Sequence, residues 1–309
     1  MRNTFAEELY RNAIRDKSIY IVVADISPAG NMQNFQKKYP DRFINVGVSE
    51  MTMIGMCAGL ALEKKRAFAY TIANFTLYRP FEMVRNDLCY QNLPVTIVGM
   101  GAGTTYANLG GTHISQEDIS IARSIPNMSI IAPSDPLELK NAVNYCCKKS
   151  KSPIYLRIGK SGEQNYTQNS KEKWAFGKIR KIISGTQVCI LTYGPIIKKA
   201  FKLKENLLKE NIIPSIYSCS TIKPFDNLRL KRIFKKYSKI IIIEDHSIIN
   251  GLNQIVKVEA FENKYTGKII NFSLQDKFLN NYESQDALLK THGLSDKLIL
   301  SKTIKMIKE

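Results

Sequence analysis

Short apolar runs alternate with stretches of helical length along the whole chain, and this pattern constrains the fold more than any other feature. The runs have the length and the β-branched content of buried strands. They read IYIVVADI, RFINVGV, RAFAYTI, PVTIVGM, SIIAPS, PIYLRI, QVCILTY, IIPSIYS, KIIIIED and KIINFSL. Strands separated by helices form parallel sheets that are covered on both faces. The sequence therefore predicts an α/β protein with doubly wound, mostly parallel sheets.

The intervening segments predict helices and a division into two domains. After an amphipathic segment at the N-terminus, helical patterns cover residues 50–62, 77–91, 115–123, 136–148, 196–209, 227–236 and 251–262. The stretch GKSGEQNYTQNSKEK interrupts the alternation because it is polar and holds few apolar residues. We therefore expect a first domain at 1–162, a linker at 163–177 and a second domain at 178–309.

Composition excludes several classes of protein. No apolar run has the length of a membrane helix, and the N-terminus lacks the basic-then-apolar order of a signal peptide. The six cysteines show no CxxC or Cys/His ligand spacing, which argues against zinc and predicts reduced thiols in the cytoplasm. The net charge of +18 lies mostly after residue 160, on lysine-rich amphipathic segments. Because aromatic residues are not interleaved with these lysines, we interpret them as solvated faces and expect no nucleic-acid partner.

The residues whose side chains could bind a ligand or take part in catalysis follow the predicted strands of the first domain. Asp25, Glu50 and Phe75 each come just after a strand, and a glycine-rich stretch containing His113 follows another. Ligands of open parallel sheets bind beyond the carboxyl ends of the strands, so we expect these residues to share one edge. Individually they are weak signals. GMGAG lacks the GxGxxG spacing, and either His113 or Phe75 alone could be structural.

Glu50 is the most informative of these residues because it begins an apolar, small-residue helix in NVGVSEMTMIGMCAGLAL. Ser49 is a good N-cap for that helix. One interpretation places Glu50 partly in solvent, where the helix dipole stabilises it. The other places its carboxylate in a pocket, where it holds a protonatable nitrogen of a ligand.

The sequence resembles the transketolase family, specifically the C-terminal half of transketolase and of deoxyxylulose-phosphate synthase as a separate chain. The matching stretches are RFINVGVSEMTMIGMCAGLAL, AYTIANFTLYRPFEMVRND, LGGTHISQEDISIARSIPNMSIIAPSDPLEL, PIYLRI and TIKPFD with IIIIEDHSIINGL. The resemblance implies a pyrimidine-binding domain followed by a transketolase C-terminal domain, with thiamine diphosphate as the cofactor.

The resemblance also implies roles for individual residues. Glu50 would hydrogen-bond a ring nitrogen of the aminopyrimidine and thereby favour the imino form that activates the thiazolium carbon. Phe75 would stack on the pyrimidine with Tyr78 nearby, and Asp25 would lie near the pyrimidine end of the pocket. His113 would face the thiazolium and the substrate as a hydrogen-bond donor or proton shuttle, and Arg157 would contact a substrate phosphate.

Departures from the family pattern limit what the resemblance implies. Relatives carry Asp-Gly-Pro-Thr-His where this chain has Leu109-Gly110-Gly111-Thr112-His113, so an acid that recognises a sugar hydroxyl is replaced by Leu109. The chain has no GDG segment for the diphosphate and its metal. We therefore predict no metal ligands here, and a partner, the N-terminal transketolase-like subunit, that holds Mg²⁺ or Ca²⁺.

The expected assembly is an α2β2 heterotetramer that contains a homodimer of this chain. The expected reaction is the transfer of a two-carbon ketol or acyl unit to a sugar or sugar-derived acceptor. One alternative is the beta chain of a 2-oxo acid dehydrogenase decarboxylating component. The other is a non-catalytic scaffold of the same fold.

Overall fold

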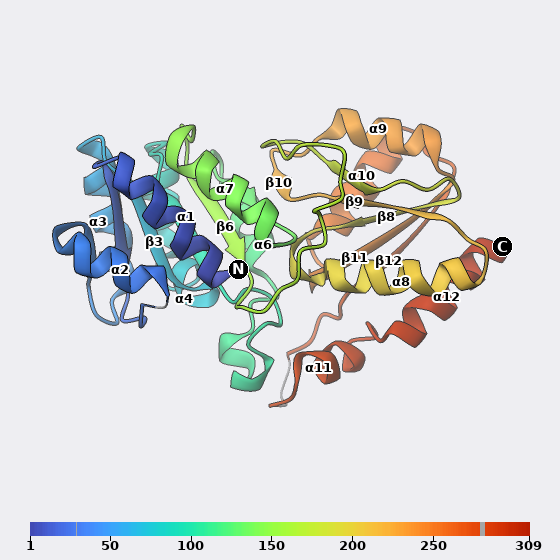
Figure 1. Cartoon of the computed structure of the whole chain (residues 1–309). Coiled ribbons are helices and arrows are strands. Elements are labelled where there is room, and N and C mark those ends of the chain that lie inside the picture. The colour runs from blue at the N-terminus through green and yellow to red at the C-terminus, as the bar shows by residue number, and fades with distance from the viewer. Residues whose placement is uncertain (29, 279–281) are drawn as a thin grey trace.

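The computed structural model describes residues 1–28, 30–278 and 282–309 and contains two largely parallel sheets, one in each half of the chain (Figure 1). The first sheet has the strand order β10-β5-β6-β4-β3-β1-β2, and the second has the order β12-β11-β8-β9-β7. The prediction of an α/β fold with two doubly wound, mostly parallel sheets is confirmed.

The first sheet consists of parallel strands with one antiparallel edge. Its parallel strands are β1 (Ile19–Val23), β2 (Phe43–Asn45), β3 (Arg66–Ile72), β4 (Thr96–Met100), β5 (Ser129–Ile131) and β6 (Ile154–Ile158). The edge strand β10 (Thr221–Lys223) comes from the second half of the chain and pairs antiparallel with β5. Because the other strands run parallel, their carboxyl ends meet at one edge of the sheet.

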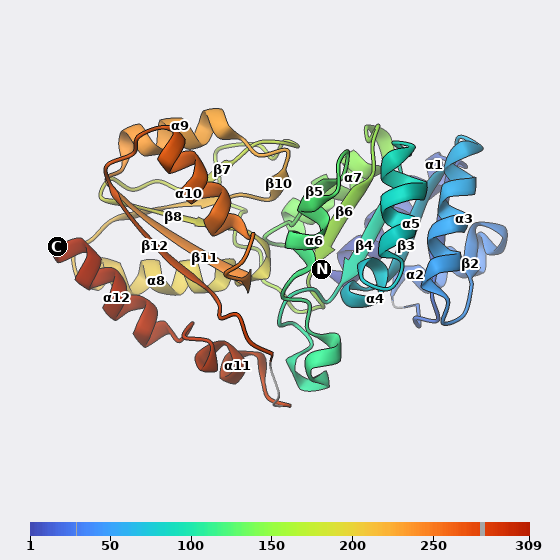
Figure 2. The same cartoon turned by 180° about the vertical axis from the view of Figure 1, so that it is seen from behind.

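Helices cover both faces of this sheet, because its strands are apolar on both sides. One face carries α1 (Arg2–Arg15), α2 (Asn31–Lys38) and α7 (Pro136–Lys148) (Figure 1). The other carries α3 (Glu50–Leu62), α5 (Phe81–Met83), the π-helical segment η2 (Val84–Tyr90) and α6 (Asp118–Ser124) (Figure 2). The short helix α4 (Ala73–Leu77) follows directly on β3.

The second sheet repeats this arrangement. Its strands are β7 (Arg180–Ile183), β8 (Val188–Thr192), β9 (Pro214–Ser218), β11 (Lys239–Ser247) and β12 (Lys268–Leu274), of which β7 is antiparallel to β9. One face packs against α8 (Ile197–Lys209) and α12 (Asp296–Lys308). The other packs against α9 (Asn227–Lys236) and α10 (Leu252–Glu262). Helix α11 (Gln285–Thr291) precedes α12.

The two halves of the chain share packed interior. One cluster of buried apolar residues runs from Ile130 in the first sheet to Ile222 in β10 and on to Ile240 in the second sheet. The segment predicted as a linker has no helix or strand, but it is packed, because Trp174 donates to Ser220 Oγ at 2.9 Å and Phe176 stacks on Tyr145. The halves are therefore joined by buried contacts as well as by the chain.

Several helical boundaries differ from the prediction. The helix expected at 77–91 is divided into α4, α5 and η2, with Pro80 between the first two, and the helix expected at 115–123 begins at Asp118. Proline lacks the amide hydrogen that a continuous helix needs, which explains the first break. No helix in the described residues is long and apolar enough to cross a membrane.

Candidate active site

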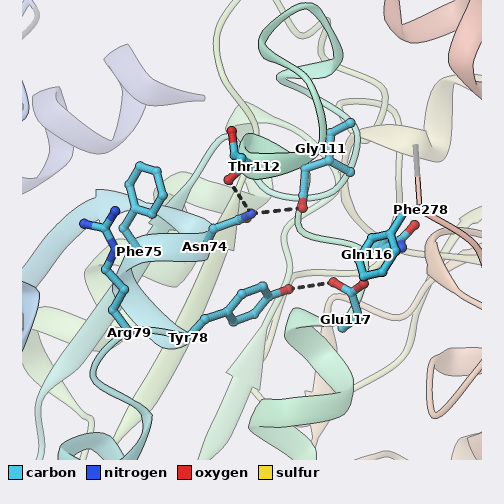
Figure 3. Close-up of a pocket in the computed structure, with 10 residues that line it drawn as sticks. Asn74, Phe75, Tyr78, Arg79, Gly111, Thr112, Gln116, Glu117 and Phe278 are labelled. Carbon is cyan, nitrogen blue, oxygen red and sulfur yellow. Dashed lines mark hydrogen bonds between the residues drawn. The ribbon is translucent and has the colours of Figure 1, made fainter. Parts of the chain in front are cut away.

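A pocket of about 410 Å³ lies beyond the carboxyl ends of β3 and β4, between α4 and the start of α6 (Figure 3). Most of its lining comes from the first half of the chain, and Phe278 adds an aromatic ring from the second half. The other lining residues are Asn74, Phe75, Tyr78, Arg79, Gly111, Thr112, Ile114, Gln116 and Glu117. The position at this edge is the one that the alternation of strands and helices predicted.

Glu50 lies at the first position of α3, where Ser49 is the N-cap residue. The carboxylate is only 5% exposed, so the interpretation that placed it partly in solvent is wrong. Its two oxygens accept hydrogen bonds from Arg79 Nη1 at 2.9 and 3.0 Å. A buried carboxylate needs a partner, and Arg79 supplies it in this chain.

Arg79 connects Glu50 to Phe75, and the sequence analysis did not identify it. Its guanidinium carbon lies 4.4 Å from the centre of the Phe75 ring, within the range of a cation–π contact, and Figure 3 shows it beside that ring. Phe75 and Arg79 stand four residues apart around α4, a spacing that brings side chains together on a helical turn. That spacing was the signal available in the sequence.

His113 lies edge-on to Phe75, with ring centres 5.4 Å apart and planes at 74°. Asn74, the neighbour of Phe75, donates to the carbonyl oxygens of Thr112 at 2.9 Å and of Ile114 at 3.0 Å. Figure 3 shows these two bonds, and because their acceptors directly precede and follow His113 in the sequence, they tie its backbone to α4. The structure thus brings Glu50, Phe75 and His113 together through two residues, Arg79 and Asn74, that the sequence analysis had not identified.

Tyr78 lies on the inner side of the same pocket. Its hydroxyl donates to Glu117 at 3.1 Å. Burial raises the pKa of Tyr78 well above its usual value, and the nearby charges of Asp118 and Glu117 raise it further. Tyr78 is therefore a neutral hydrogen-bond donor at physiological pH.

Of the predicted site residues, Phe75 and Tyr78 line the pocket. Glu50 and His113 lie behind its lining, in contact with Arg79 and Phe75, and Asp25 and Arg157 are not among the lining residues either. Asp25 is exposed at the end of β1, with φ at 45°, and its backbone N–H donates to Asn45 Oδ1. Arg157 is only 2% exposed; its Nε donates to Asp118 and its Nη2 to the carbonyl of Asp245, both at 2.8 Å. In this structure Arg157 makes internal contacts between the two halves, so a contact with a substrate phosphate would require this network to open.

Acidic neighbours of Arg157 offset the effect of burial on its pKa. Burial alone would lower the pKa of the guanidinium, but the charge of Asp118 and further acidic neighbours raise it above its usual value. Burial also raises the pKa of Asp245, whose carboxylate accepts the backbone N–H of Thr104. Arg157 is therefore charged at physiological pH.

The residues around Arg79 fit a flat heterocycle that carries N–H groups. A buried carboxylate acceptor and an aromatic face both contact one planar group with N–H donors, the Arg79 guanidinium. The described residues contain no group of three or more His, Cys, Asp or Glu that could hold a metal ion.

Two known protein families match the two halves of the chain. Residues 1–164 match the family described as transketolase, pyrimidine binding domain, and residues 177–299 match transketolase, C-terminal domain. The chain belongs to the transketolase family. Membership implies dependence on thiamine diphosphate, and Glu50 and Phe75 lie within the part that matches the pyrimidine-binding domain.

Transketolase chains of similar size occur among the relatives. A putative transketolase C-terminal section from Methanocaldococcus jannaschii is 33% identical over 100% of this chain and 96% of its own length. One of the subunits of apulose-4-phosphate transketolase from Phocaeicola vulgatus is 30% identical over 87% of this chain and 86% of its own. This chain spans about half of the 1-deoxy-D-xylulose-5-phosphate synthases that it matches, for example 48% of the enzyme from Clostridium kluyveri.

Solved transketolase structures agree with this assignment. A chain described as a split gene transketolase, inactive beta4 tetramer, superposes with a TM-score of 0.89 at 27% identity, over 99% of this chain and 98% of that one. The transketolase from Campylobacter jejuni shares the fold, with a TM-score of 0.80 at 14% identity over 98% of this chain and 46% of its own.

Proposed function

We propose that this chain is the pyrimidine-binding subunit of a split, thiamine-diphosphate-dependent transketolase that transfers a two-carbon ketol or acyl unit to a sugar or sugar-derived acceptor. The cofactor supplies the carbon nucleophile when bound. Glu50, Phe75, Tyr78 and Asp25 would surround the pyrimidine, while His113 would donate or shuttle a proton near the substrate. Arg157 remains a candidate contact for a substrate phosphate if its internal network opens.

One observation carries the proposal: the buried Glu50 carboxylate and the Phe75 ring face the same planar group, the Arg79 guanidinium. A carboxylate that accepts from a ring nitrogen, beside an aromatic face that fixes the ring plane, can orient and polarise an aminopyrimidine. His113 lies edge-on to the same Phe75 ring and is held by Asn74. This position supports a role for His113 as a hydrogen-bond donor or proton shuttle beside a bound ring.

The second half of the site would come from another chain. The sequence contains no GDG segment, and we assign the diphosphate and its Mg²⁺ or Ca²⁺ to a partner, the N-terminal transketolase-like subunit. The relatives named as a transketolase C-terminal section and as one subunit of a transketolase support a divided enzyme. The assembly would be α2β2 around a homodimer of this chain. All six cysteines are free and buried, as suits a cytoplasmic enzyme.

The proposal favours transketolase over the beta chain of a 2-oxo acid dehydrogenase, because both matched families and the named relatives are of the transketolase type. A non-catalytic scaffold would have no need for a buried carboxylate beside an aromatic ring. The presence of Glu50, Phe75 and His113 around one location therefore argues against that alternative.

The test is Glu50→Gln in the two-chain enzyme, with Glu50→Ala as a second variant. Both proteins should keep their circular dichroism spectra, because Arg79 is half exposed and water can solvate it once the carboxylate is gone. Hydrogen exchange at the thiazolium carbon and turnover should fall by orders of magnitude. Calorimetry of this chain alone with thiamine diphosphate and Mg²⁺ should show no micromolar binding. Normal exchange in Glu50→Gln would remove the proposed role.

A further inference from the structure

Arg79 occupies the space that the proposed ligand ring needs. Its Nη1 donates to both oxygens of Glu50, at 2.9 and 3.0 Å, while its guanidinium lies over the face of Phe75. These are the two groups to which the aminopyrimidine would bind. A protonated ring nitrogen cannot donate to Glu50, nor the ring stack on Phe75, while the guanidinium holds both contacts.

The two ends of this contact differ in their exposure. The Glu50 side chain is 5% exposed, and the Arg79 side chain is 49% exposed. Arg79 can therefore move into solvent at little cost, whereas Glu50 cannot be left without a partner in an apolar site. A ligand with a protonated ring nitrogen could replace Arg79 as the donor to Glu50, so that the carboxylate is paired both before and after binding.

We infer that Arg79 is a stand-in for the aminopyrimidine, closing the ring subsite in the free chain and setting how tightly that subsite holds its ligand. The inference rests on the proposed function, because it names a competitor within the same subsite. Arg79 thereby lowers the affinity of the subsite for the ring. It also pairs with the buried Glu50 carboxylate while no ligand is bound.

The size of the effect follows from the contacts that must be broken. A half-exposed ion pair and an exposed cation–π contact are each weak, and together they reduce ligand affinity by roughly three- to tenfold. Substituting Arg79 by a side chain of similar length without charge should therefore increase affinity by that factor. A residue that contacted the ligand directly would change affinity in the opposite direction.

The experiment uses the full-length chain and 4-amino-5-hydroxymethyl-2-methylpyrimidine as the probe, because this fragment needs no diphosphate site. Ligand-observed NMR titration gives its dissociation constant for wild type and for Arg79→Met, in which binding should be roughly three- to tenfold tighter. Arg79→Lys should fall between them. Arg85→Met is the matched control, since Arg85 is exposed nearby and donates to Asn86, and its affinity should equal that of wild type.

A second comparison guards against misfolding. Arg79→Met leaves Glu50 unpaired, so the free variant should melt below wild type, and the fragment should raise its melting temperature more than that of wild type. Glu50→Gln with Arg79→Met removes both charges and should fold, and its gain in affinity over Glu50→Gln alone should be smaller than the gain in the wild-type background, because only the competition for the Phe75 face remains. A gain of the same size in both backgrounds would overturn the inference, since Arg79 would then not compete through Glu50.

The outcomes separate the inference from the proposed function. Equal or weaker fragment binding by Arg79→Met, with binding by wild type intact, overturns the stand-in and leaves the proposed function in place. Binding by neither protein shows that the free chain has no ring subsite for Arg79 to close and overturns the inference, while hydrogen exchange at the thiazolium carbon in the two-chain enzyme still decides the proposed function. Tighter binding by Arg79→Met, with Arg85→Met unchanged, supports the inference.

Discussion

Replacing Arg157 by methionine should destabilise the protein strongly, because this side chain holds a buried network together. Arg157 is 2% exposed, and its Nε donates to Asp118 Oδ2, which also accepts from the hydroxyl of Tyr155, each at 2.8 Å. Its Nη2 donates to the carbonyl of Asp245, on β11 of the second sheet. One residue therefore links strands of both halves.

The magnitude follows from what the substitution leaves behind. Asp118 has 0% exposure, and its Oδ1 has no hydrogen-bond partner among the residues that the structure describes, so Tyr155 would be its remaining donor there. Breaking a buried ion pair by removing one partner costs about 3–5 kcal/mol. Each kcal/mol lowers the melting temperature by about 2–4 °C in a domain of 150–250 residues, so a decrease of roughly 6–20 °C is expected.

Denaturant unfolding and calorimetry of Arg157→Met measure this loss directly. Arg157→Met with Asp118→Asn should recover part of it, because the buried negative charge is then removed. Arg11→Met is the matched control, because the Arg11 side chain is 54% exposed and Glu8, one of its two partners, keeps Lys140 as a partner, so the loss should be less than about 1 kcal/mol. If Arg157→Met keeps wild-type stability but loses affinity for phosphorylated substrates, the structural role is wrong and the sequence-based role as a substrate contact is supported.

Two further predictions concern pH and substrate choice. Burial and the charge of Lys277 lower the pKa of His292 to about 4, and its Nδ1 accepts the Gln275 N–H. Because the unfolded chain binds the proton first, stability should fall by up to about 3 kcal/mol as pH drops from about 6.5 to about 4. Urea unfolding across this range should show a shallower loss in His292→Gln, and equal slopes would contradict the assignment. Leu109 is 41% exposed, so Leu109→Asp should be ionised and shift the two-chain enzyme from deoxy toward hydroxylated substrates. Competition assays measure this shift, and ordinary turnover of xylulose 5-phosphate with ribose 5-phosphate by wild type would refute it.

The parallel strands were predictable because each is a continuous apolar run, buried on both faces by helices. Two strands, β7 and β10, were not predicted. Both are short antiparallel edge strands, and each forms only because a partner distant in the sequence lies beside it. Thr221 of β10, for example, pairs with Ile131, far away in the sequence. Local patterns carry little information about such pairings.

The candidate site was predictable in its residue types but not in its internal contacts. Strand ends indicated Glu50, Phe75 and His113, because ligands bind beyond the carboxyl ends of parallel strands. Arg79 and Asn74 were not identified, since each acts on a partner about 30 to 40 residues away. The partner of a buried charge is fixed by the folded geometry, and a sequence alone gives only the list of candidates.

The glycine-rich stretch shows how the second half of the chain reaches the site. Gly103 has φ at 67°, and a Cβ there would lie 2.3 Å from the Asp245 carboxylate, so a side chain is excluded. The same carboxylate accepts the N–H and the hydroxyl of Thr104. GMGAG begins a loop that is held by Asp245 at one end and by Asn74 at the other, on either side of His113. The second half of the chain therefore contributes to the placement of His113 through Asp245, which does not line the pocket itself. Because Arg157 donates to the carbonyl of Asp245, the loop is also tied to the buried network that joins the two halves.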